Sequence, residues 1–170
     1  MPKTDSTDED EVAGISISFC LSSDNIDPAL ITIQLGVEPS KAWAKGDKYL
    51  GKKLNLETRR IEQCWREHPW GLWCLNSGTR VISNDIEAHV VSMLSVFESK
   101  KDILKCYVED PECAVRFHIK WEAAEGRSGY ELSSEFLVRL AALSNYIQFD
   151  YHCVASQRKD EQKHLPGLLD

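Results

Sequence analysis

Three segments of this chain alternate apolar and polar residues with a period of two, and this alternation constrains the fold more than any other feature. Residues 14–22, 113–123 and 146–154 all follow the pattern. Their apolar positions are Ile15, Ile17, Phe19 and Leu21, then Val115, Phe117, Ile119 and Trp121, then Ile147, Phe149, Tyr151 and Cys153. A period of two predicts strands with one face on a core and one face in water, which is typical of antiparallel sheets.

Helices are predicted between these strands. Asp27 is a predicted N-cap, Pro28 occupies the first helical position and Gly36 ends the helix. Further helices are expected over residues 86–97 after Asn84 or Asp85, over a turn or two near residues 100–108, and from Glu135 after Ser133 or Ser134.

Two more strands are predicted over residues 59–67 and 71–77, joined by a turn at residues 68–70, and residues 37–57 are predicted to be a loop. The order is therefore β-α-ββ-α-β-α-β. We expect an α+β fold, a two-layer sandwich with a mainly antiparallel sheet and helices on one face, broadly ferredoxin-like.

The length of 170 residues suits one domain. We expect a disordered acidic tail over residues 1–13, a single α+β domain over residues 14–155 and a mobile C-terminal tail over residues 156–170. Both end segments are too polar to bury enough surface to offset their ordering entropy.

Composition and cysteine usage indicate the compartment. The six cysteines contain no Cys-x-x-Cys pair, the first residues lack the features of a signal peptide, and no apolar run is long enough to span a bilayer. We expect a cytoplasmic protein with free thiols, no metal, no cofactor and no membrane contact. The net charge of -7 disfavours binding to nucleic acid.

Three of the five tryptophans lie in or beside loops that contain glycine. A possible pocket would be lined by Trp43, Lys45, Asp47, Trp70 and Trp73, and it could take a small molecule or nucleic acid. The alternative is a structural clasp in which Trp43 folds back onto the edge of the core near Trp73.

The polar positions of the alternating strands share the open face of the predicted sheet. On residues 113–123 they are Arg116, His118, Lys120 and Glu122, and on the last strand they are Gln148, Asp150 and His152. If the strands are neighbours, His118, Asp150 and His152 converge. Such a group could be a metal site, an acid–base pair, a protein-binding surface or a solvated polar face.

Charge is unevenly distributed along the chain. Residues 41–60 are strongly basic and residues 81–114 are acidic. Acidic positions in and after the third helical segment, namely Asp102, Glu109 and Asp110, could face a basic protein partner, because complementary potentials speed association. No serine elbow, phosphate loop or protease signature is present, so we expect a protein that is not an enzyme.

Several short motifs, taken in order, resemble the domain-of-unknown-function family 4279, a group of small, mostly bacterial proteins. They are Asp27-Pro28, Leu35-Gly36, Pro39, Trp43, Lys45-Gly46-Asp47, Gly71-Leu72-Trp73 and the Glu131-Leu132-Ser133 stretch before a helix. The resemblance implies an α+β fold and carries no catalytic residues. It also implies a candidate immunity protein, because relatives of this kind often accompany secreted toxins. We therefore expect a non-enzymatic protein-interaction module that binds and blocks a toxin domain, and its acidic positions suit a basic one.

Overall fold

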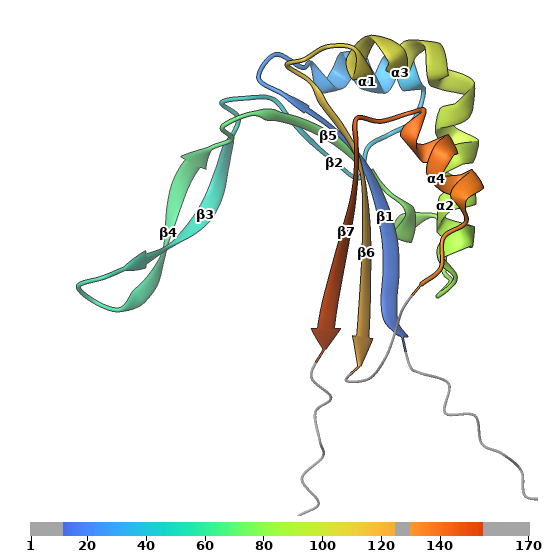
Figure 1. Ribbon diagram of the computed structural model, residues 1–170. Coiled ribbons are helices and arrows are strands. Elements are labelled where there is room, and N and C mark those ends of the chain that lie inside the picture. Colours follow the sequence, from blue (N-terminus) through green and yellow to red (C-terminus); the bar gives the residue numbers. More distant parts are fainter. Residues whose placement is uncertain (1–11, 125–129, 155–170) are drawn as a thin grey trace, which may run out of the picture.

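The computed structural model describes residues 12–124 and 130–154, and it is an α+β fold in which helices cover one face of a five-stranded sheet (Figure 1). The predicted tails over residues 1–13 and 156–170 fall almost entirely outside the described residues, although Val12 and Ala13 belong to the first strand. The elements are β1 (Val12–Ser23), α1 (Pro28–Leu35), β2 (Lys41–Trp43), β3 (Lys48–Asn55), β4 (Arg60–Glu67), β5 (Gly71–Asn76), α2 (Ile86–Phe97), α3 (Lys101–Val108), β6 (Ala114–Ala124), α4 (Ser134–Ala141) and β7 (Tyr146–Val154), with 3-10 turns at Ser77–Thr79 and Glu98–Lys100.

The sheet has the strand order β2-β5-β1-β6-β7. The first four strands are antiparallel to their neighbours, and β7 adds a parallel edge beside β6. The unit from β1 to β6, with β3 and β4 set aside, is the β-α-β-β-α-β arrangement of a split βαβ fold. The predicted ferredoxin-like α+β sandwich is therefore confirmed, with α4 and β7 as an addition at one edge.

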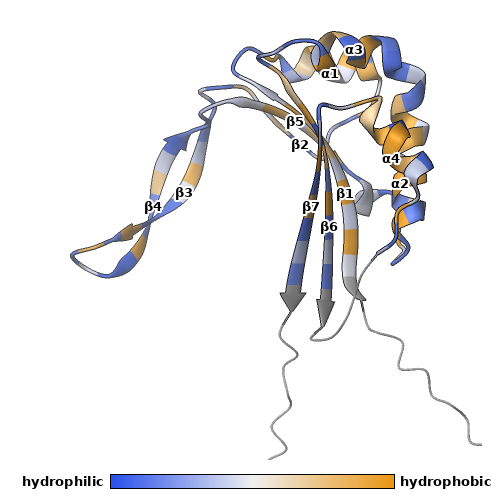
Figure 2. Cartoon of the chain, in the orientation of Figure 1, coloured by the Kyte–Doolittle hydropathy of each residue, from blue (hydrophilic) through white to orange (hydrophobic). Residues whose placement is uncertain are grey.

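The apolar positions of the alternating strands form the core. Ile17, Phe19 and Leu21 of β1 and Phe117 of β6 have no exposed surface. The helices lie along one face of the sheet, and apolar segments occur in both layers (Figure 2). Phe19 lies at the centre of an aromatic cluster, with ring centroids 4.1 Å from Phe97 and 5.0 Å from Phe117. Close packing of this kind makes each of these positions sensitive to a change of volume.

The helix boundaries follow the predicted capping residues. The Asp27 carboxylate accepts a hydrogen bond of 2.9 Å from the Ala29 amide, and Gly36 ends α1 with a positive φ of 64°. Asp85 rather than Asn84 caps α2, and Ser133 rather than Ser134 caps α4.

The prediction for residues 37–70 is wrong in two respects. Residues 37–57 contain β2 and β3 instead of a loop, and β4 pairs with β3 instead of forming a hairpin with β5. Gly51 and the adjacent Lys52 and Lys53 interrupt the two-residue period of β3. The strand needs no buried face, because the two-stranded unit projects away from the core.

The buried polar side chains of Ser77 and His89 are joined in one chain of hydrogen bonds. The Ser77 hydroxyl accepts from the Ile17 amide at 2.8 Å and lies 2.7 Å from Nδ1 of the buried His89. His89 Nε2 lies 2.9 Å from the Ser83 carbonyl oxygen, which can only accept. The proton is therefore on Nε2, and Nδ1 accepts from the Ser77 hydroxyl.

Replacement of Ser77 tests the contribution of this chain. We expect Ser77→Ala to lower the free energy of unfolding by about 1–3 kcal/mol, because it leaves the Ile17 amide and His89 Nδ1 buried without partners. Urea denaturation measures the change. The control is Ser95→Ala on the exposed face of α2, where the hydroxyl bonds only to the Ser92 carbonyl; equal effects of the two substitutions would contradict the assignment.

Candidate interaction surface

The hairpin of β3 and β4, residues 48–67, is called the arm. Its register continues that of the β2–β5 pair, since Lys41 opposes Cys74, Trp43 opposes Leu72 and Lys48 opposes Glu67. The arm is therefore an extension of one long hairpin whose base lies in the sheet. Figure 1 shows it leaving the sheet on the side opposite the helices.

The bend at the base of the arm, residues 44–47 and 68–70, is held by aromatic stacking. The His68 ring stacks against Trp43 at 4.2 Å and against Tyr49 at 4.4 Å between centroids. The His68 amide donates to the Asp47 carbonyl at 2.9 Å, and Gly46 donates to the His68 carbonyl at 2.8 Å. The cross-strand pairing thus continues through the bend, so that the arm has a defined direction.

A local turn brings the chain into the arm. The Asp47 carboxylate accepts from the Ala44 amide at 2.8 Å, and Gly46 has φ of 87°, a conformation that favours glycine. Lys45 forms an ion pair of 2.5 Å with Asp24, which joins this turn to the end of β1. Lys45 and Asp47 therefore hold the bend, whatever else they contact.

The three loop tryptophans are not brought together. Trp73 is fully buried on the core face, where its indole N–H donates to the Thr32 hydroxyl at 3.0 Å. Trp43 lies on the opposite face of the sheet, because it opposes Leu72 while its neighbour Ala42 opposes Trp73. Trp70 is 51% exposed. Trp43 thus clasps His68 rather than the core edge near Trp73, and its buried indole N–H has no hydrogen-bond partner among the described residues.

The arm carries an apolar stripe that sequence reasoning missed. Leu50 opposes Trp65 and Leu54 opposes Ile61, so these four side chains share one face of the hairpin. They are exposed to 51%, 72%, 53% and 71%, respectively. The spacing of Leu50, Leu54 and Leu56 at even intervals was the available signal. We call Leu50, Leu54, Ile61 and Trp65 the arm stripe.

The arm as a whole is basic. The basic residues of the arm are Lys48, Lys52, Lys53, Arg59, Arg60 and Arg66, against Glu57, Glu62 and Glu67. Lys52 lies on the same face as the stripe, between its two apolar pairs, because it opposes Gln63. The arm therefore presents apolar side chains within a positive potential.

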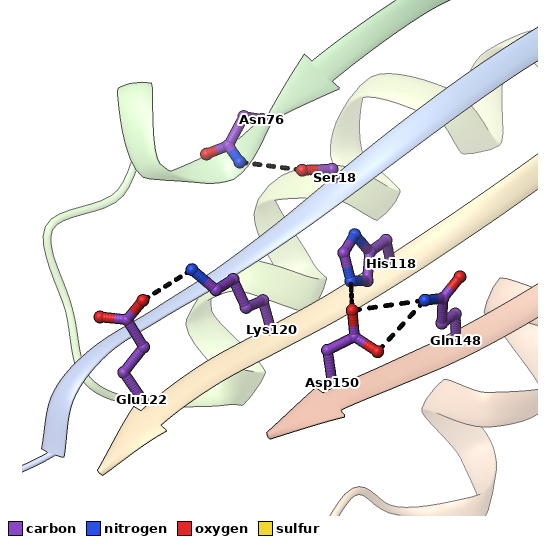
Figure 3. A network of polar contacts seen from close by, with 7 residues as sticks. All are labelled: Ser18, Asn76, His118, Lys120, Glu122, Gln148 and Asp150. Atoms are coloured by element: carbon purple, nitrogen blue, oxygen red, sulfur yellow. Dashed lines mark hydrogen bonds and ion pairs between the residues drawn. The ribbon is translucent and has the colours of Figure 1, made fainter. Parts of the chain in front are cut away.

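The open face of the sheet carries a polar network (Figure 3). His118 Nε2 lies 2.6 Å from the Asp150 carboxylate, which also accepts from Gln148 at 3.1 Å. The hydrogen bond from Gln148 and then that from His118 lower the pKa of Asp150 below its ordinary value of 3.8. The strands thus bring together His118 and Asp150, two members of the predicted group of three, while His152 lies opposite Glu122.

The other residues of this face are placed separately. His152 is exposed and opposes Glu122, and Lys120 forms an ion pair of 2.6 Å with Glu122. Arg116 lies over the Tyr146 ring, 5.5 Å from its centroid. In residues 12–124 and 130–154, no three His, Cys, Asp or Glu side chains are grouped to hold a metal ion.

The acidic positions predicted to bind a partner lie in a different layer. Asp102 and Asp110 line a groove together with Ile103 and Tyr107 of α3. The Tyr107 hydroxyl donates a hydrogen bond to Gln34 of α1, which also lines the groove. Glu109 is exposed at the end of α3. The eight predicted partner-binding residues are therefore divided between the helical layer and the open sheet face.

Comparison with known proteins identifies the family. A family model described as a domain of unknown function (DUF4279) matches residues 13–154, so the chain belongs to this family, as its motifs indicated. No curated protein and no solved structure gives a significant match. Within the described part of the chain, each helix is too short or too polar to cross a bilayer.

The His118–Asp150 contact predicts a pH-dependent contribution to stability. Because the pKa of Asp150 is lowered in the folded chain, its carboxylate stabilises the fold above pH 3.8, and this contribution is lost as the pH falls through the lowered pKa. We expect Asp150→Asn to lower the urea midpoint at pH 7 and to come closer to the parent chain at about pH 2, where more of the carboxyl is protonated.

The control for this prediction is Glu67→Gln, at an exposed position at the base of the arm. It should leave the urea midpoint unchanged at both pH values. An equal loss for Asp150→Asn at both pH values would show that the charge of Asp150 does not act through this contact.

Proposed function

We propose that this member of the DUF4279 family is a non-enzymatic protein-interaction module and that the arm stripe is its principal contact. The observation that carries the proposal is the set of four apolar side chains, each more than half exposed, on one face of a projecting hairpin. Large exposed apolar side chains gathered on one face of a projecting element mark surfaces that bind another macromolecule. Trp65 is the expected energetic centre, because tryptophan is enriched among residues that dominate binding.

The form of the arm supports this proposal. Each strand has eight residues, which gives a reach of about 26 Å at about 3.3 Å per residue. An isolated two-stranded hairpin is marginally stable in water, and a partner that covers the stripe would add the missing apolar layer. The stacked bend at His68 directs the arm before the partner arrives, which lowers the ordering cost of binding.

The chemistry of the partner follows from the charge around the stripe. Lys48 and Lys52, which share the face of the stripe, and the net positive charge of the arm favour a folded protein domain with an apolar hollow and an acidic rim. We propose further that this partner is a toxin domain that the chain blocks, an immunity-type role that agrees with the family resemblance. On this proposal the arm would complement an acidic site on the toxin, whereas the acidic positions of α3 were expected to face a basic one.

The free thiols support a reducing, cytoplasmic location as part of the same proposal. Cys20, Cys64, Cys74, Cys106 and Cys113 are all unpaired in the described part of the chain. Free thiols persist in compartments where glutathione and thioredoxin keep them reduced. A cytoplasmic inhibitor would meet its toxin before or after secretion, inside the cell that it protects.

Substitution of Trp65 tests the role of the stripe. After capture and identification of the partner, the purified pair is measured by calorimetry. We expect Trp65→Ala to raise the Kd by at least about 30-fold, as for the loss of a dominant contact residue. The matched control is Ile33→Ala on α1, an apolar residue that is 78% exposed and lies outside the arm. Equal, small effects of both substitutions would overturn the proposal.

Charge reversal decides which surface meets the partner. We expect Lys52→Glu with Lys53→Glu to slow association and to change its salt dependence, because long-range attraction acts mainly on the association rate. The triple reversal of Asp102, Glu109 and Asp110 to lysine should leave the rate unchanged. The opposite pattern would move the contact to the acidic groove of α3 and restore a basic partner.

The same basic arm, with Trp65 exposed on it, also suits single-stranded nucleic acid. This alternative is tested directly with a fluorescent oligonucleotide. Tight binding that falls steeply with salt and is lost in Trp65→Ala would replace the protein partner with a nucleic acid. We expect no such binding, since the net charge of the chain is -7.

A further inference from the structure

Two cysteines face each other across the central strands of the sheet. Cys20 of β1 and Cys74 of β5 are directly opposite in the register. Their chain neighbours Phe19, Leu21 and Trp73 are buried on the core face, so both thiols belong to the open face. Both are free, with Cys20 half-buried and Cys74 only 8% exposed.

The geometry of this pair matches that of a disulfide. Directly opposed residues of antiparallel strands have Cα atoms about 4.5 or about 5.5 Å apart, depending on the kind of pair. Disulfides join residues whose Cα atoms are roughly 4.4–6.8 Å apart. Closure of a bond between Cys20 and Cys74 therefore needs rotation of side chains and no rearrangement of strands.

The surroundings of the pair prepare one sulfur for attack. The hydrogen bond between the two thiols lowers the pKa of Cys74 and raises that of Cys20. Lys41 opposes Cys74 and Arg116 opposes Cys20 in the same cross-strand row. These two cations favour a thiolate and attract anionic reactants to this part of the open face.

We propose that Cys20 and Cys74 form a redox-active dithiol site that reduces low-molecular-weight disulfides, with anionic ones such as glutathione disulfide preferred. The Cys74 thiolate attacks one sulfur of the reactant, whose S–S bond breaks, and the first thiolate leaves and takes up a proton. The Cys20 thiol loses its proton and attacks the Cys74 sulfur. The second thiol leaves, so the protein loses two electrons and two protons and the reactant becomes two thiols.

The other described cysteines lack this arrangement. Cys64 opposes Gly51 in the arm, and Cys106 lies on the exposed side of α3, with its thiol toward the Asp102 carbonyl. Cys113 is buried, and burial raises its pKa to about 11. Cys106 is therefore the matched control. It is more exposed than either member of the pair, but it lies on a helix and does not face another thiol across two strands.

The experiment treats the reduced full-length chain with glutathione disulfide, then alkylates the remaining thiols and maps the peptides by mass spectrometry. We expect a cross-link between Cys20 and Cys74 in the parent chain and in Cys106→Ser. In Cys20→Ser we expect a stable glutathione adduct on Cys74 and no cross-link. Glutathione adducts without the cross-link in the parent chain, or a cross-link between other cysteines, would overturn the proposal.

A second measurement uses the parent chain alone, so it does not depend on the folding of a variant. Phenylarsine oxide binds two neighbouring thiols, and we expect it to protect Cys20 and Cys74 together from alkylation while Cys106 stays reactive. Alkylation of Cys20 at an unchanged rate would contradict the site. These tests are independent of the proposed role of the arm stripe, because they leave Trp65 and the rest of the arm unchanged.

Discussion

β1 is hydrogen-bonded on both sides, to β5 and to β6, and most of the structure depends on its register with these two strands. Its apolar positions meet Trp73 and Leu75 on one side and Val115, Phe117 and Ile119 on the other. A shift of one residue would turn every one of these side chains to the open face. Because the helices cover only one face, the register also decides which polar residues meet on the other face.

The two faces of the sheet therefore have different uses. The core face is filled by aromatic and branched side chains. The open face carries the His118–Asp150 contact and the opposed pair of Cys20 and Cys74. The hairpin that begins in β2 leaves on the open side and presents the arm stripe to solvent. Every group with a proposed role thus lies on the side that the helices leave free.

Prediction from the sequence succeeded where a single face is buried. The alternation in β1 and β6 and the caps Asp27 and Ser133 identified elements that pack on the core. It failed over β3, because that strand is not packed on the core and its lysines obscure the period. The last strand shows an intermediate case: Phe149 and Tyr151 alternate as expected but stay partly exposed, since β7 is at the edge of the sheet.

The sequence by itself determined the α+β class, the family and the face on which each residue of the alternating strands lies, because these follow from local periodicity and capping. Only the tertiary structure decided which strands are neighbours. That choice separates Trp43 from Trp73, divides the acidic groove of α3 from the open face, and sets Cys20 opposite Cys74. The physical reason is that pairing between strands distant in the chain depends on the packing of the whole sheet and its helices. The sequence of a short segment therefore does not predict it.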